Sequence, residues 1–251
     1  MTSISANTNL NMKRRMNKRT KSILEASVEE FIRTGVPVTS DHLYERHDFG
    51  IQSAMIRWEL KRLCDDGYLY QLHPSGGRYP SNKAYRFLVS QLLIQEDASE
   101  NGDRSVLGRE LALKQWKEFT DDLADTLNVF GVCYEEEEKN VWTSGLSDLF
   151  MQLEVETKQE MAEVAGDVER LPHRIKEQEE HWSVTSEWPR VFIGKNALTK
   201  SSHLSVIAHR LEGGTERVML LAIGPKRMNY RRSLNLFRFL ERSWSEATAN
   251  Q

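Results

Sequence analysis

The stretch FGIQSAMIRWELKRLCDDGYLYQLHPSGGRYPSNKAYRF, residues 49–87, decides the fold of this chain. Within it, Ile56, Leu60 and Leu63 recur at the spacing of one buried face of an α-helix. The outward side of the same helix carries small, apolar, aromatic and cationic side chains: Ala54, Met55, Arg57, Trp58, Lys61 and Arg62. The pattern therefore predicts an amphipathic helix that offers a mixed surface to a partner.

A β-hairpin is predicted directly after this helix. Residues 65–67, Asp-Asp-Gly, end the helix, and residues 68–72 alternate as a strand. The turn at 75–77, Ser-Gly-Gly, is expected to present Arg78. Ser81 caps a further helix, so the segment is a helix, a hairpin and a second helix.

Two more helices are predicted upstream. The first is an amphipathic helix that contains residues 23–32 and closes at Thr34-Gly35. The second is shorter, is capped by Thr39 or Ser40, and runs through Arg46. Three helices followed by a hairpin is the order of a winged helix-turn-helix, whose third helix can lie in a DNA major groove about 12 Å wide. A winged helix used only for protein contacts is the alternative.

Charge favours a nucleic-acid partner. Residues 12–90 hold 14 Lys and Arg against 9 Asp and Glu, a balance of +5. The whole chain is −3 and residues 1–11 are uncharged, so the part from Gln91 onward is −8. Only the basic part can gain binding affinity by neutralising DNA phosphates and releasing their counterions. Residues 1–15 are expected to be a disordered basic arm, which follows the DNA backbone or only solubilises the chain.

Four stretches of the N-terminal part resemble the DNA-binding head of HrcA-type heat-inducible transcription repressors. They are VEEFIRTGVPVTS (28–40), SAMIRWEL (53–60), LCDDGYL (63–69) and HPSGGRYPSNKAYRF (73–87). Three later stretches resemble that family's C-terminal GAF-like domain: TSGLSDLF (143–150), RVFIGKN (190–196) and AIGPKRMNYRRSLNLFRFLE (222–241). The matches keep the family's order and reach both ends of the chain.

The resemblance implies a cytoplasmic, nucleoid-associated repressor of heat-shock (chaperone) genes. It would bind double-stranded DNA at an inverted-repeat operator as a homodimer and be released on stress, with a chaperonin as a further partner. The alternative is a ligand-sensing or protein-interaction module whose winged helix no longer reads DNA. The residues expected at DNA are Ser40, Gln52, Ser53, Ala54, Met55, Arg57, Trp58, Lys61, Arg62, His73, Ser75, Arg78, Lys83, Tyr85 and Arg86.

The chain also departs from the family pattern. Trp58 stands where the family has Asn, and an indole cannot make the two amide hydrogen bonds that read adenine. Met55 replaces Thr, Gln52 replaces a capping Ser, and Pro74 and Gly76 replace Thr and Ala. Only residues 90–144 separate the head from the Gly-Leu signature, too few for the family's dimerising insertion.

The predicted fold class is α+β: an N-terminal winged helix-turn-helix followed by a reduced GAF-like α/β domain with an antiparallel sheet. The expected domains are the arm (1–15), the winged helix (16–94), a linker (95–105) and the GAF-like regulatory domain (106–251). Expected helices of the last domain are 107–127, 151–178 with a break at Pro172, and 229–246. Expected strands are 130–134, 190–193, 204–211 and 218–223, with 135–138 as a solvated acidic turn.

The apolar line of the 151–178 helix leaves two interpretations open. Leu153, Met161, Val164 and Val168 either pair two copies of the chain or pack on the chain's own sheet. A dimer seam of this kind would replace the missing insertion, because an inverted-repeat operator calls for two heads on a two-fold axis.

Enzymatic chemistry is not expected, and neither is a cofactor. His173, Glu177 and His181 have metal-ligand spacing on a helix but are read as a solvated face, so no metal site is predicted. Cys64 and Cys133 have no partner pattern, which suits a reducing cytoplasm. No apolar run approaches the roughly 18 residues of a membrane span, so no membrane is expected. With 251 residues, 39% of them hydrophobic, the chain can hold two domains with their own cores.

Overall fold

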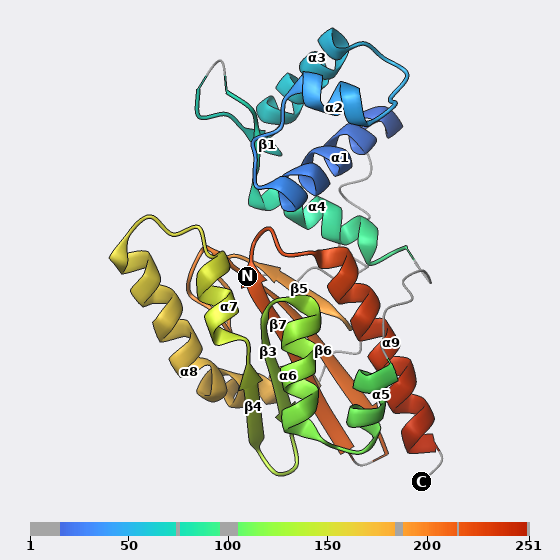
Figure 1. Cartoon of the computed structure of the whole chain (residues 1–251), viewed down its shortest axis with the longest axis vertical. Helices are drawn as coiled ribbons and strands as arrows, with labels where there is room; N and C mark the ends of the chain where they lie inside the picture. Colours follow the sequence, from blue (N-terminus) through green and yellow to red (C-terminus); the bar gives the residue numbers. More distant parts are fainter. Residues whose placement is uncertain (1–15, 74–75, 96–104, 184–187, 215, 250–251) are drawn as a thin grey trace. The chain divides into compact units, whose positions relative to one another are not determined.

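The chain folds as two units, one of which ends at Ile94 while the other begins at Gln95. A computed structural model describes residues 16–73, 76–95, 105–183, 188–214 and 216–249, and Figure 1 shows their helices and strands. The expected arm (1–15), Ser75 and most of the expected linker (95–105) lie outside these ranges. Each unit is described by itself below. The mixture of helices and antiparallel strands confirms the α+β class.

The N-terminal unit consists of helices and one short hairpin. Its elements are α1 (Lys18–Thr34), α2 (Ser40–Arg46), α3 (Ser53–Asp65), β1 (Leu69–Tyr70), β2 (Tyr79–Pro80) and α4 (Asn82–Leu92). Strands β1 and β2 pair antiparallel, Leu69 opposite Pro80. An antiparallel bridge between Val38 and Arg78 ties the hairpin to the segment between α1 and α2.

Local signals set the ends of these helices. The Asn17 side chain accepts a hydrogen bond from the backbone N–H of Thr20 at 2.8 Å and so caps α1, which ends at Gly35 in the left-handed region (φ 68°). Of the two candidate caps for α2, Thr39 is the one that caps it. Gln52 occupies the N-cap position of α3 without a side-chain cap bond.

A buried carboxylate joins α1 to α2. Glu30 receives hydrogen bonds from Arg33 at 2.5 Å and faces the Nε2 atoms of His42 at 3.0 Å and His47 at 3.3 Å. Burial by itself would raise the pKa of Glu30, but the bonds from Arg33, His42 and His47 outweigh it and hold the pKa at about 2. Glu30 is therefore ionised in the folded unit and fastens three segments together.

The C-terminal unit is a five-stranded antiparallel sheet with helices on both faces (Figure 1). Its helices are α5 (Ser105–Ala112), α6 (Trp116–Leu127), α7 (Leu146–Gln152), α8 (Lys158–Ser183) and α9 (Tyr230–Ala249). Its strands are β3 (Phe130–Glu135), β4 (Asn140–Ser144), β5 (Arg190–Ile193), β6 (Leu204–Gly213) and β7 (Glu216–Pro225). Their order across the sheet is β4-β3-β7-β6-β5.

Side chains that alternate along the strands divide the sheet into two covered faces. Val132 and Tyr134 of β3 belong to a core that includes Leu149 of α7 and Val164 of α8. The alternate residues face the other way: the ring of His209 on β6 stacks on that of Phe237 on α9, with centroids 5.9 Å apart. Helices α5 and α6 cover this second face beside α9.

Several expected element boundaries are wrong. The expected helix 107–127 is two helices, α5 and α6, and 151–178 is divided between α7 and α8. Helix α8 starts with a capping box, in which Thr157 Oγ1 accepts from the N–H of Glu160 and Glu160 accepts from the N–H of Thr157. Pro172 lies inside α8 and does not end it. Leu171 and Ile175, on either side, are fully buried, so tertiary packing keeps the helix continuous.

The expected solvated turn at 135–138 is also wrong in part. Glu136 is buried and accepts two hydrogen bonds from the Arg210 guanidinium, at 2.8 and 2.7 Å. This bidentate pair satisfies a charge that could not otherwise be buried. Strand β4, which follows this turn, was not expected from the sequence, and it forms one edge of the sheet.

The apolar line of the 151–178 segment packs on the chain's own sheet. Val164 is fully buried, and Leu153 and Val168 pack against the same core. This is the second of the two interpretations. The dimer seam on these side chains is therefore wrong, because residues needed for it are committed to the interior of the unit.

Candidate nucleic-acid interface

The outward face of α3 is apolar in its N-terminal half. Trp58 is 71% exposed and Met55 is 51% exposed, and Ala54 beside them is also exposed. Ile56, Leu60 and Leu63, on the opposite face, are fully buried and anchor the helix to its unit. We call Ala54, Met55 and Trp58 the apolar patch. A tryptophan this exposed is uncommon on a protein surface and indicates an interaction site.

The polar groups nearest the apolar patch are engaged with one another. Arg57 Nε donates to Ser40 Oγ at 3.5 Å, and Arg57 Nη2 lies 4.0 Å from an Asp41 carboxylate oxygen. The Ser53 hydroxyl donates to the same carboxylate. The start of α3 thus carries an internal network that ties it to α2, and the patch lies beside this network.

Cations gather toward the C-terminal half of α3. Lys61 and Arg62 are exposed, with Lys61 Nζ 5.9 Å from the centre of the Trp58 ring. Arg62 lies 4.0 Å from Asp66 in an exposed pair, which stabilises the helix by about 0.5 kcal/mol at most. Both cations therefore remain accessible to a polyanion.

Contacts between its two sides brace the hairpin. The rings of Tyr70 and Tyr79 stack across the strands with centroids 5.4 Å apart, and the Gln71 amide donates to Gly76 O at 2.6 Å. Leu72 is 63% exposed and His73 is exposed. Ser75, which was expected in the turn, lies outside the described residues.

Two of the residues expected at DNA are buried and a third is partly buried. Ser40 and Tyr85 are each 3% exposed, because Ser40 lies in the first turn of α2 against α3 and Tyr85 lies on the buried face of α4. Arg78 is half-buried, because its bridge to Val38 holds it against the segment between α1 and α2. Its guanidinium lies beside the Cys64 thiol.

The Cys64 thiol is partly buried beside Arg78. Burial raises its pKa, and the neighbouring Arg78 guanidinium lowers the pKa by less. The thiol is thus protonated near neutral pH and acts as a partner for Arg78.

Lys83 and Arg86 are exposed on α4, directly after the hairpin. Lys83 Nζ donates to Asp66 O at 2.7 Å and lies 4.1 Å from the centre of the Tyr68 ring. Lys83 therefore stabilises the end of α3 in addition to exposing a positive charge. Gln52, at the first position before α3, is exposed.

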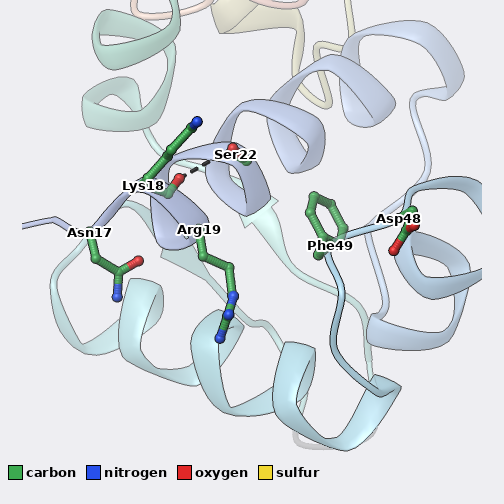
Figure 2. Close-up of a pocket in the computed structure, with 6 residues that line it drawn as sticks. All are labelled: Asn17, Lys18, Arg19, Ser22, Asp48 and Phe49. Atoms are coloured by element: carbon green, nitrogen blue, oxygen red, sulfur yellow. Dashed lines mark hydrogen bonds between the residues drawn. The ribbon is translucent and has the colours of Figure 1, made fainter.

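A pocket of about 560 Å³ lies at the start of α1 (Figure 2). It is lined by Asn17, Lys18, Arg19, Ser22, Asp48 and Phe49. Lys18 and Arg19 add two cations there, but Asp48 from the segment between α2 and α3 opposes them. Sequence reasoning missed Asp48 and Phe49 here, because the pocket brings together residues about thirty positions apart.

The part of the chain that the structure describes holds no group of three His, Cys, Asp or Glu side chains that could bind a metal ion. Among the same residues, no helix is long and apolar enough to cross a membrane.

Comparison with known families identifies the chain by its C-terminal unit. The family described as "HrcA protein C terminal domain" matches residues 88–234, more than half of the chain. The chain belongs to the HrcA family. This confirms the resemblance noted in the sequence, including its extension to the C-terminal domain.

Similar proteins include two that are named heat-inducible transcription repressor HrcA. The one from Acetivibrio thermocellus is 43% identical over 82 residues, which cover 33% of this chain and 23% of that protein. The one from Clostridium tetani is 46% identical over 78 residues, which cover 31% of this chain and 22% of that protein. The chain thus matches less than a quarter of the length of either HrcA relative.

A crystal structure described only as that of a hypothetical protein shares the fold of this HrcA family member. The TM-score is 0.71 at 19% identity, over 94% of this chain and 99% of the other. At that identity the similarity concerns the fold alone.

Proposed function

We propose that this HrcA family member is a sequence-specific DNA-binding repressor whose N-terminal unit is a winged helix-turn-helix. The observation that carries the proposal is α3. Its buried face is fixed by Ile56, Leu60 and Leu63, and its opposite face is exposed beside a hairpin. A helix held in this way can enter a major groove, with the hairpin as the wing.

The exposed residues divide into two roles. Ala54, Met55 and Trp58, with Gln52 at the start of the helix, face the base edges. Lys61, Arg62, Lys83, Arg86 and the start of α1 contact phosphates, and His73 and the hairpin tip contact an adjacent groove or the backbone. Arg57 and Ser53 orient α3 through Asp41. Phosphate contacts position the protein, and base contacts specify the sequence.

The biological role follows from the family. The related proteins are named heat-inducible transcription repressors. The chain would accordingly repress heat-shock (chaperone) genes from an inverted-repeat operator and leave it on stress, as a cytoplasmic homodimer that responds to a chaperonin. The GAF-like unit, residues 106–251, would be the regulatory domain.

Selection of duplexes from a random library by the purified full chain, followed by footprinting, tests the proposal. We expect recovery of an inverted repeat with half-sites about one helical turn apart. Lys61→Ala should weaken binding to selected and random DNA alike, whereas Lys176→Ala, an exposed cation of the other unit, should change neither. Recovery of no preferred sequence would contradict the proposal.

One observation favours a second function. Trp58 and Leu72 are exposed apolar side chains on the helix and the hairpin of the same unit, as on a protein-docking surface. A failure to bind any duplex at low salt would favour a protein-interaction module, in which the winged helix contacts another protein.

A further inference from the structure

The chemistry of the apolar patch narrows what α3 can read. Base edges in the major groove present hydrogen-bonding atoms everywhere, but only thymine presents a methyl group there. Ala54 and Met55 have no side-chain donor, and Trp58 has only its indole N–H. The patch therefore lacks the paired donors and acceptors with which Arg reads guanine or Asn reads adenine.

Gln52 at the N-cap position is exposed and carries an amide that can supplement the patch, but the polar side chains within the first two turns of α3 are already in contact with α2 or α1. Arg57 is 64% exposed; it lies 3.5 Å from Ser40 Oγ and 4.0 Å from Asp41, contacts that orient it toward α2 without burying it, whereas the Ser53 hydroxyl donates to Asp41. Lys61 and Arg62 lie one turn further along α3, where they suit phosphates on either side of a groove. Among the described residues of the first two turns of α3, the outward side chains that form no hydrogen bond or ion pair are those of the apolar patch.

Charge around the patch favours DNA over an apolar protein partner. Lys61 and Arg62 border the patch on α3, and the segment 12–90 carries a net charge of +5. A protein interface core is depleted of charge, whereas a groove-binding face combines central base contacts with peripheral cations.

We infer that Ala54, Met55 and Trp58 select the operator by contact with thymine 5-methyl groups in the major groove. The operator half-site then contains thymine at the base pairs that α3 covers. The inference rests on the proposed DNA-binding function and deepens it, because it names what the recognition helix reads.

Replacing thymine by deoxyuridine tests this directly, since the exchange removes the methyl group and leaves base pairing intact. Duplexes selected by the full chain are remade with one thymine at a time exchanged, and the Kd of each is measured by fluorescence anisotropy. At one or more positions under α3 the affinity should fall about fourfold, the factor expected for one buried methyl-sized group. Equal affinity at every position would overturn the inference.

Variants assign the effect to the patch. Trp58→Ala should abolish the thymine preference at its position while the chain stays folded, because the side chain is 71% exposed. Met151→Ala removes an equally apolar side chain that is 84% exposed in the other unit, and it should keep the preference. A preference retained by both Trp58→Ala and Met55→Ala would mean that DNA shape is read instead, and the inference would be wrong.

The outcomes separate the two proposals. If the parent chain binds a selected sequence but does not distinguish thymine from uracil, the thymine reading fails and the repressor function stands. If the parent chain selects no sequence, the proposed function fails and the thymine reading fails with it.

Discussion

Glu30 shows how one buried residue can set the acid stability of the N-terminal unit. Its pKa is about 2 in the folded chain, against 4.5 for an ordinary Glu. The contribution of ionised Glu30 to the free energy of unfolding is therefore complete above pH 4.5 and is lost as the pH falls toward 2. Glu30→Gln should lower the free energy of unfolding at pH 7 by up to about 3 kcal/mol.

Urea unfolding followed by circular dichroism measures this loss. Glu29→Gln, a change at the exposed neighbouring carboxylate, is the matched control and should have little effect. The difference between parent and Glu30→Gln should shrink as the pH approaches 2. A difference that stays constant with pH would show that Glu30 acts through shape and not through its charge.

His209 makes a corresponding prediction for the C-terminal unit. Burial, together with the Arg238 charge, lowers the pKa of His209 from 6.5 to about 3. The unfolded chain takes up a proton at a pH where the folded chain does not, so stability falls as the pH drops from 6.5 toward 3. At pH 4.5 the loss from this residue is about 3 kcal/mol.

His209→Leu should remove that acid sensitivity. Unfolding of the C-terminal unit, compared at pH 7 and pH 4.5, should show a smaller drop in the variant than in the parent. His173→Leu is the control, since the side chain of His173 is 78% exposed. The same drop in parent and His209→Leu would assign the acid sensitivity to other groups.

At the residue scale, the sequence predicted which side of α3 is buried and which is exposed. Trp58 and Lys61 are exposed as the helical spacing indicates, because amphipathic periodicity is a local property. The expectation of DNA contact was wrong for Ser40 and Tyr85, which are polar but buried against neighbouring elements. Their burial depends on contacts between segments distant in sequence, and no local pattern carries that information.

At the scale of elements, the hairpin depends on one glycine. A Cβ built on Gly77 would meet three atoms of Pro37 at 2.5, 2.6 and 2.7 Å. Gly77→Ala should push the hairpin from the segment between α1 and α2, at a cost of about 1–3 kcal/mol. Thermal unfolding and operator affinity should both decrease.

Gly76→Ala is the comparison within the same hairpin. Its added Cβ would meet its nearest atom, His73 O, only at 3.3 Å, so a smaller loss is expected. Equal losses for the two variants would assign the effect to the flexibility of the turn and not to the close approach of Pro37.

Two errors in the helix boundaries come from local start and stop signals. Thr157 and Glu160 form a capping box that is visible in the sequence and marks a helix start. The prediction of one continuous helix over 151–178 did not take this signal into account. Pro172 gave the opposite error, because a local stop signal was overridden by the burial of Leu171 and Ile175. Strand β4 was missed because its residues, Asn-Val-Trp-Thr-Ser, do not alternate between buried and exposed positions.

At the scale of the whole molecule, charge is unevenly distributed between a basic N-terminal part and an acidic remainder. Residues 12–90 carry +5, and residues 91–251 carry −8. Operator affinity should therefore fall steeply with salt, with a log–log slope of about −0.9 per contacted phosphate. Anisotropy titrations at several salt concentrations measure the slope.

Lys61→Ala should make that slope less steep by the contribution of about one phosphate contact. Met151→Ala should leave it unchanged, because its side chain carries no charge. A salt-independent affinity would contradict the phosphate contacts assigned to the N-terminal unit.

The exposure of Trp58 gives the molecule an optical property of its own. All six tryptophans lie in the described ranges, and Trp116, Trp182 and Trp244 are at most 8% exposed while Trp142 and Trp188 are half-buried. A collisional quencher such as acrylamide should consequently reach the indole of Trp58 well before the others. The unlabelled chain thus carries an intrinsic fluorophore at the centre of α3, and anything that covers this helix should protect its emission.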